Sequence, residues 1–95
     1  MHKPSLDISH LLSETDLAAI EARVTASSPG PWVSYVEGRD HWSGSSFIMT
    51  GSAEHRGEDI ELIGATIADQ DFIAAARQDI PRLLAEIRLL RQFLK

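Results

Sequence analysis

The polar segment at residues 37–46 holds the side chains best suited to bind a ligand. A hairpin turn needs only about two to five residues, commonly Asn-Gly or Asp-Gly. This segment instead contains arginine, aspartate, histidine, tryptophan and several serines. A guanidinium can bind a phosphate or carboxylate through two hydrogen bonds, an indole can stack on a planar ring, and hydroxyl groups donate hydrogen bonds. These types predict recognition of an anionic, ring-containing ligand by Arg39, Asp40, His41, Trp42, Ser43, Ser45 and Ser46.

A purely structural interpretation of the same segment stays open. Trp42 would then pack beneath a sheet, Arg39 would pair with Asp40 or Glu37, and the serines would only fill a hairpin. Trp32 is a different case, because it directly follows a proline at a helix-to-strand corner, where we expect a core side chain.

Catalysis and metal binding fit the spacing poorly. Asp40, His41 and Ser45 are the residue types of a hydrolase triad, but neighbouring residues in an extended chain point to opposite sides. No helical His-x-x-x-His spacing and no calcium-binding loop pattern occur. We therefore expect no enzyme activity, no cofactor and no metal, although histidines stand at His2, His10, His41 and His55.

Size and charge exclude further classes of protein. A chain of 95 residues predicts one domain with one small core. It has no Cys, which excludes disulfide scaffolds and thiol catalysis, and no apolar run approaches a membrane span or a signal peptide. A formal net charge of -5 argues against binding a nucleic-acid polymer. We expect a soluble cytoplasmic protein that binds neither nucleic-acid polymers nor membranes.

The first half of the chain predicts a helix and a hairpin. Residues 1–12 predict a partly ordered arm, and residues 13–95 a compact core. Ser13 or Thr15 is expected to cap a helix over residues 14–26, and Ser13 with Asp16 three residues later comes close to a capping box. The Pro- and Gly-rich segment that follows ends this helix. β-branched and aromatic residues predict strands over residues 32–36 and 46–50, and a third over residues 59–64.

The second half predicts two helices. Thr66 and Asp69 form another capping pair, and Gln78 and Asp79 are expected to break the helix that they open. Asp79 then caps a last helix, whose apolar stripe is expected to reach the core. The predicted fold is a single α+β domain over residues 1–95, with an N-terminal helix, a three-stranded antiparallel sheet and two C-terminal helices.

Two apolar residues near the C-terminus lie off that stripe. Leu89 and Phe93 give the last helix a second apolar face, which a small protein cannot easily leave exposed to water. The pattern predicts a homo-oligomer with Leu89 and Phe93 in its interface.

Two short motifs carry a family resemblance. The Ser-Pro-Gly-Pro-Trp turn at residues 28–32 and the helical segment at residues 71–87 resemble small phage and prophage accessory proteins of the Ead-like type. The resemblance implies a phage-related accessory role and no reaction. It does not extend to residues 38–46, so it implies no activity for the polar loop.

Together these features predict a small, non-catalytic, oligomeric binding protein of phage or prophage type. The most concrete version sequesters an anionic, nucleotide-like signal used in anti-phage defence. The alternative is a protein-interaction module that inhibits or adapts a host or phage protein through its acidic surface, with no small ligand.

Overall fold

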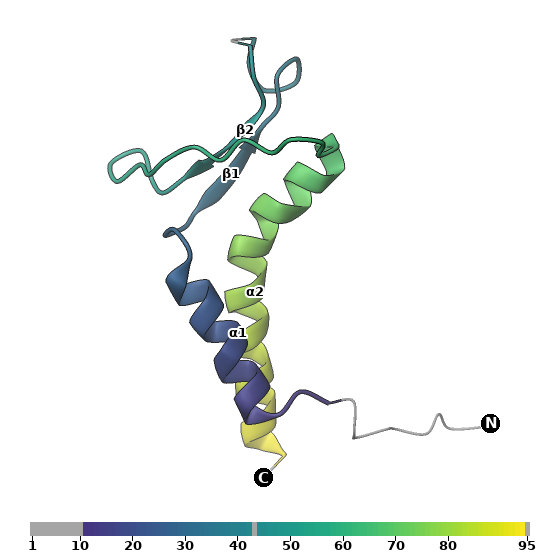
Figure 1. The fold of residues 1–95 in the computed structure, drawn as a ribbon. Coiled ribbons are helices and arrows are strands. Elements are labelled where there is room, and N and C mark those ends of the chain that lie inside the picture. Colours follow the sequence, from purple (N-terminus) through teal and green to yellow (C-terminus); the bar gives the residue numbers. More distant parts are fainter. Residues whose placement is uncertain (1–10, 43, 95) are drawn as a thin grey trace, which may run out of the picture.

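The fold is described by a computed structural model for residues 11–42 and 44–94. The elements follow the order α1 (Glu14–Ala26), β1 (Trp32–Tyr35), β2 (Phe47–Thr50) and α2 (Ile67–Phe93). The α+β class is therefore confirmed. Figure 1 shows α1 beside the C-terminal half of α2 and the two strands against its N-terminal half. Most of the predicted N-terminal arm, residues 1–10, lies outside the described residues.

Both helices begin at the predicted capping boxes. The Ser13 hydroxyl accepts the backbone N–H of Asp16 at 3.0 Å, and the Asp16 carboxylate accepts the N–H of Ser13 at 2.8 Å. Thr66 and Asp69 make the same reciprocal pair at the start of α2, with both distances 3.0 Å. Each box satisfies two N–H groups that the helix leaves without partners. The predicted bounds of α1 are confirmed.

The predicted break at Gln78 and Asp79 is wrong, because α2 continues through Pro81 as one helix. Proline costs the helix one hydrogen bond and favours a bend, and α2 does bend along its length (Figure 1). Within this continuous helix, Gln78 bonds the first strand. Its side-chain oxygen accepts the backbone N–H of Trp32 at 2.7 Å. Its amide nitrogen donates to the carbonyls of Trp32 and Ala74 at 3.1 and 3.0 Å.

The sheet consists of β1 and β2, which pair antiparallel with Trp32 opposite Thr50 and Tyr35 opposite Phe47. A second glutamine of α2 fastens both strands to the helix. The side-chain amide of Gln70, which is buried, donates to the Ser34 hydroxyl at 2.9 Å and to the carbonyls of Tyr35 and Phe47, each at 3.2 Å. Gln70 and Gln78 therefore bond strand groups that would otherwise stay unpaired at the helix.

The predicted third strand is also wrong. In the described part of the chain, Ile60 alone of that segment pairs with β2, through two backbone hydrogen bonds to Ile48 at 2.8 and 2.9 Å. Before Ile60 the chain stays close to β2, since the Gly57 N–H and the Thr50 hydroxyl donate to the carbonyls of Thr50 and Glu58 at 2.9 and 2.8 Å. These bonds do not extend the ladder, and beyond Ile60 the segment leads to the start of α2 (Figure 1).

The core is small and the molecule is elongated. Its radius of gyration is 17.6 Å, with extents of 54 × 34 × 20 Å, whereas a compact chain of this length has a radius of about 12 to 13 Å. The apolar stripe on the second half of α2 was expected to be core, but Leu83 and Leu90 are 56% and 55% exposed. Among the described residues, the buried apolar side chains are Leu17, Val36, Ile48, Ala74 and Leu84.

Candidate functional site

The loop between β1 and β2 is fixed by its own backbone. The N–H groups of Arg39 and Asp40 both donate to the carbonyl of Val36, at 3.1 and 2.8 Å. Gly38 donates to the carbonyl of His41 at 2.8 Å, and its φ of 87° lies in the left-handed region that favours glycine. The loop is thus a defined structure, and it lies at the end of the molecule away from α1 (Figure 1).

The guanidinium of Arg39 lies between two carboxylates. Its Nη1 and Nη2 donate to the two oxygens of Asp71 at 2.8 and 3.0 Å, and its Nε and Nη2 donate to Asp40 Oδ2 at 3.0 and 2.9 Å. Asp40 Oδ2 also accepts the N–H of Val36 at 2.8 Å. Because Asp71 belongs to α2, this Arg39–Asp40–Asp71 cluster fastens the loop to the helix.

The cluster shifts the titration of its members. Hydrogen bonds from Arg39, and then from Ser34, lower the pKa of Asp71 to about 2. Hydrogen bonds from Arg39, and then from the Val36 backbone, lower the pKa of Asp40, while the bonds to Asp71 and then Asp40 raise the pKa of Arg39. All three groups are therefore charged at neutral pH. Solvent screens them, since the Arg39 side chain is 44% exposed, so the cluster contributes more to orientation than to stability.

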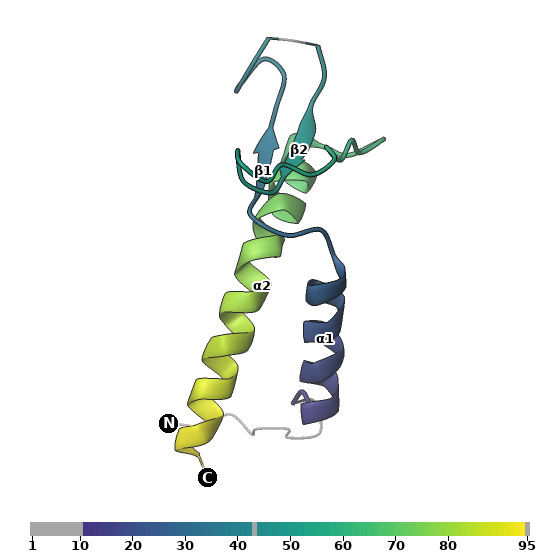
Figure 2. The same ribbon diagram turned by 90° about the vertical axis from the view of Figure 1, so that its left-hand side faces the viewer.

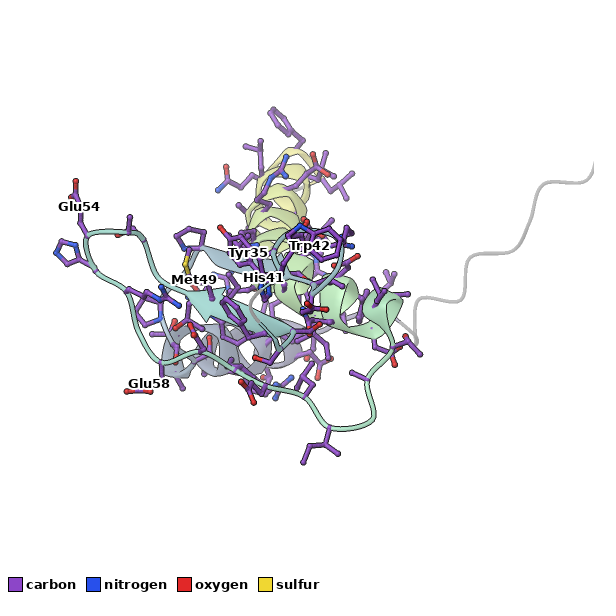
Figure 3. The ribbon with its side chains drawn as sticks, turned by 90° about the horizontal axis from the view of Figure 1, so that it is seen from above. Tyr35, His41, Trp42, Met49, Glu54 and Glu58 are labelled. Carbon is purple, nitrogen blue, oxygen red and sulfur yellow. The ribbon has the colours of Figure 1, made fainter. Side chains whose placement is uncertain are left out.

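Aromatic rings cover the base of the loop. The rings of Tyr35 and Phe47 stack with centroids 5.5 Å apart, and the half-buried ring of His41 lies 5.4 Å from Phe47. Figure 3 shows Tyr35, His41 and Trp42 together over one end of the molecule, seen from above. Trp42 is 82% exposed, so the interpretation that it packs beneath the sheet is wrong.

The serines of the segment do not gather around Arg39. The Ser46 hydroxyl accepts the N–H of Glu37 at 3.1 Å, which closes the base of the loop. The Ser45 hydroxyl donates to Glu61 at 3.3 Å, and Ser43 lies outside the described residues. The structure thus brings Arg39 and Asp40 together, leaves Trp42 at the surface, and gives Ser45 and Ser46 partners elsewhere.

Sequence reasoning missed Asp71, which lies 32 residues from Arg39. No spacing rule pairs these residues, because only the packing of the loop on α2 brings them together. The resulting site presents an exposed indole on the same loop as a guanidinium that already has two carboxylate partners. It can make contacts through the ring without further ordering of the loop.

A second candidate surface is an open apolar groove of about 540 Å³ between α1 and α2. Ile20 and Val24 line it from α1, and Ile80 and Leu83 are among its residues from α2. Trp32 also lines it, so this tryptophan, expected in the core, is half-buried; its Nε1 donates to the Ser28 carbonyl at 3.1 Å. Among the described residues of the 37–46 loop, none lines this groove.

Leu89 and Phe93 are both exposed, and their part in an oligomer stays a prediction. Within residues 11–42 and 44–94, no group of three or more His, Asp or Glu side chains is arranged to hold a metal ion. In that same part of the chain, none of the helices has both the length and the apolar character needed to cross a membrane.

The chain was compared with protein-family models, with curated proteins and with solved structures, and none of them matches it. The resemblance to Ead-like accessory proteins therefore stays a prediction from the two motifs.

Proposed function

We propose that this chain is a non-catalytic protein-interaction module that binds a partner protein through the loop between β1 and β2. The observation that carries the proposal is the 82% exposure of Trp42, which directly follows a turn at residues 36–41 whose backbone is hydrogen-bonded. Tryptophan is the residue type that most often dominates the binding energy of protein interfaces.

The ion-pair cluster supports this function by holding the loop in place before binding. Arg39 connects Asp40 of the loop to Asp71 of α2, and Asp40 also holds the N–H of Val36. A loop that is already ordered loses little conformational entropy when a partner binds, so more of the contact energy appears as affinity.

The same cluster makes a small anionic ligand the less favoured function. Arg39 already uses its Nε, Nη1 and Nη2 groups on two carboxylates. A phosphate would have to displace or share these partners, next to two negative charges. A protein partner that contacts Trp42 can bind without displacing the carboxylate partners of Arg39.

A nucleotide-like ligand is nevertheless the second candidate. The observation in its favour is that the Arg39 side chain is 44% exposed on the same loop as the exposed Trp42. Under either candidate, the family resemblance suggests a phage-related accessory role, with a host or phage protein as partner or an anti-phage defence signal as ligand.

Site-specific photocrosslinking tests the proposal. A benzophenone amino acid replaces Trp42 in the full chain, and a matched chain carries it at Ile63, an exposed apolar position outside the loop. We expect a covalent complex with one partner protein from position 42 and not from position 63. Binding of that purified partner should then weaken more than tenfold for Trp42→Ala and stay unchanged for Ile63→Ala.

Equal binding by wild-type protein and Trp42→Ala would contradict the proposal. Calorimetry with mono-, di- and cyclic nucleotides distinguishes the second candidate. Heat that is lost in both Arg39→Ala and Trp42→Ala, and only partly recovered in Arg39→Lys, would favour the ligand over the protein partner, because lysine lacks the planar fork.

A further inference from the structure

The second half of α2 carries a strict seven-residue repeat. Isoleucine occurs at Ile73, Ile80 and Ile87, and leucine occurs at Leu83 and Leu90. In heptad notation the isoleucines occupy a positions and the leucines d positions, with Ala76 at the preceding d and Leu94 at the next a. Isoleucine at a with leucine at d favours two parallel strands in a coiled coil.

This heptad stripe, defined as the a and d positions from Ile73 to Leu94, has no complete partner within the described chain. Helix α1 packs beside it and not over it: Glu21 pairs with Arg88 at 2.8 Å, Glu14 pairs with Arg91 at 3.2 Å, and the buried leucine of this half of the helix is Leu84. Figure 2 shows α1 along one side of α2 only. Leu83 and Leu90 stay more than half exposed.

The two flanks of the stripe carry opposite charges. Arg77 and Arg91 occupy e positions on the side of α1, whereas Asp79 and Glu86 occupy g positions on the other side. In a parallel pair each g position faces the e position of the following heptad on the other helix, so Glu86 meets Arg91, while Asp79 meets Leu84 and Arg77 meets Phe72. In an antiparallel pair g faces g and e faces e, which places like charges together.

The surface is also self-complementary in shape. Leu83 lies on a ridge, because it lines both the apolar groove beside α1 and a second hollow on the acidic side. Arg23 and Arg77 line the groove, whereas Asp79 and Glu86, together with Arg82, line the hollow with Leu83. A two-fold interface uses the same surface on both copies, so each copy can place its ridge in the groove of the other.

We propose that the heptad stripe is the interface of a parallel homodimer, in which α2 of each copy occupies the groove between α1 and α2 of the other. The four helices then form a bundle around the stripe, and Glu86 of one copy faces Arg91 of the other. The interface does not involve the loop at residues 37–46, so it stands independently of the proposed function. It places both Trp42 side chains at the same end of the dimer, where they can engage a partner bivalently.

A matched pair of substitutions tests the interface. Leu83 and Leu89 are 56% and 53% exposed, but a spacing of six residues places them about 120° apart around α2, so Leu89 lies off the stripe. In sedimentation equilibrium at tens of micromolar we expect a mass of about 21 kDa for the wild type, twice the 10.5 kDa of one chain. Leu83→Glu should sediment as a folded monomer, whereas Leu89→Glu should stay a dimer. A monomeric wild type, or dissociation by Leu89→Glu and not by Leu83→Glu, would overturn the proposal.

The orientation has its own test, because the chain contains no cysteine. Leu90→Cys should form an intermolecular disulfide under mild oxidation, since d positions of a parallel pair adjoin each other. Leu89→Cys serves as the control and should not crosslink. A full antiparallel overlap of the stripes would separate the two Leu90 positions by about 20 Å. A dimer whose Leu90→Cys variant fails to crosslink would therefore overturn the parallel arrangement.

Discussion

The side chains at the two ends of this elongated molecule differ in how far they find partners within the chain. At the hairpin end, Gln70 and Gln78 bond the strands to α2, and the Arg39–Asp40–Asp71 cluster fastens the loop. At the helical end, α1 covers only one flank of α2, and the heptad stripe faces solvent. The hairpin end is held together by contacts within the chain, whereas the helical end exposes an apolar stripe that α1 leaves uncovered.

This difference separates two roles of the exposed apolar residues. Trp42 is exposed on a loop that an ion-pair cluster connects to α2, and tryptophan is a frequent recognition residue in interfaces. The exposed leucines and isoleucines of α2 instead repeat at core spacing. This difference is the basis for proposing partner recognition at the hairpin end and self-association at the helical end.

The largest stability effect is expected at the one isoleucine that β2 buries fully. Ile48 is 0% exposed and pairs with Ile60 through its backbone. Ile48→Ala should lower the free energy of unfolding by about 3 kcal/mol, because it removes buried methyl groups and leaves a cavity. Urea melts at one fixed protein concentration measure the change. Ile63→Ala, at a fully exposed isoleucine, should stay within about 0.5 kcal/mol of the wild type. Equal effects of the two substitutions would show that the hairpin end lacks a core.

The two tryptophans should differ in the same assay. Trp32 is half-buried and its Nε1 donates to Ser28, so Trp32→Ala should cost about 2 kcal/mol, less than a fully buried tryptophan would. Trp42→Ala should change stability by less than about 0.5 kcal/mol, since the ring is exposed. The reverse ranking would make Trp42 a structural residue and would remove the basis for its role in recognition.

A smaller effect is expected at Gln70. Gln70→Ala removes the hydrogen bonds to Ser34, Tyr35 and Phe47, and should lower the free energy of unfolding by about 1 to 2 kcal/mol. Gln92→Ala, at an exposed position of the same helix, is the control and should be neutral. If both variants melt like the wild type, the glutamine contacts do not hold the sheet to α2.

The smallest expected effect is on the pH dependence of stability in acid. The pKa of Asp71 is about 2 in the folded chain, below its ordinary value of 3.8, so its contribution is present above pH 4 and is lost as the pH falls toward 2. Solvent exposure makes this contribution small. Stability measured between pH 5 and pH 2 should therefore fall less steeply for Asp71→Asn than for the wild type. Identical slopes would show that the Arg39 ion pair does not persist in solution.

The sequence predicted those features of the fold that depend on neighbouring residues. Both capping boxes, the bounds of α1 and the two hairpin strands follow from local side chains and their spacing. The continuity of α2 through Pro81 could not be predicted, because it depends on contacts between Gln78 and Trp32, 46 residues apart. The prediction of a third strand was wrong for a similar reason. The path from Ile60 to the start of α2 depends on where the helix packs, which neighbouring residues do not show.

In the candidate site, too, the features set by neighbouring residues were predicted and those set by distant residues were not. The polar loop and its tryptophan were evident from composition, but the Asp71 partner of Arg39 was not, since it lies far away in the sequence. The apolar stripe of the last helix was evident from its spacing, but its assignment to the core was wrong for Leu83 and Leu90. A repeat alone does not show whether its partner is in the same chain or in a second copy.

Hydrogen exchange at two protein concentrations tests the central contrast most directly. Amide protection is compared between peptides from the heptad stripe, residues 80–94, and peptides from the strand end, residues 46–51. Dilution from tens of micromolar to well below the dissociation constant should lower protection in the stripe and leave the strand peptides unchanged, because dimer formation stabilises only what it covers. Equal protection of the stripe at both concentrations, or an equal loss in both regions, would contradict the view that the hairpin end is complete in one chain and the helical end in two.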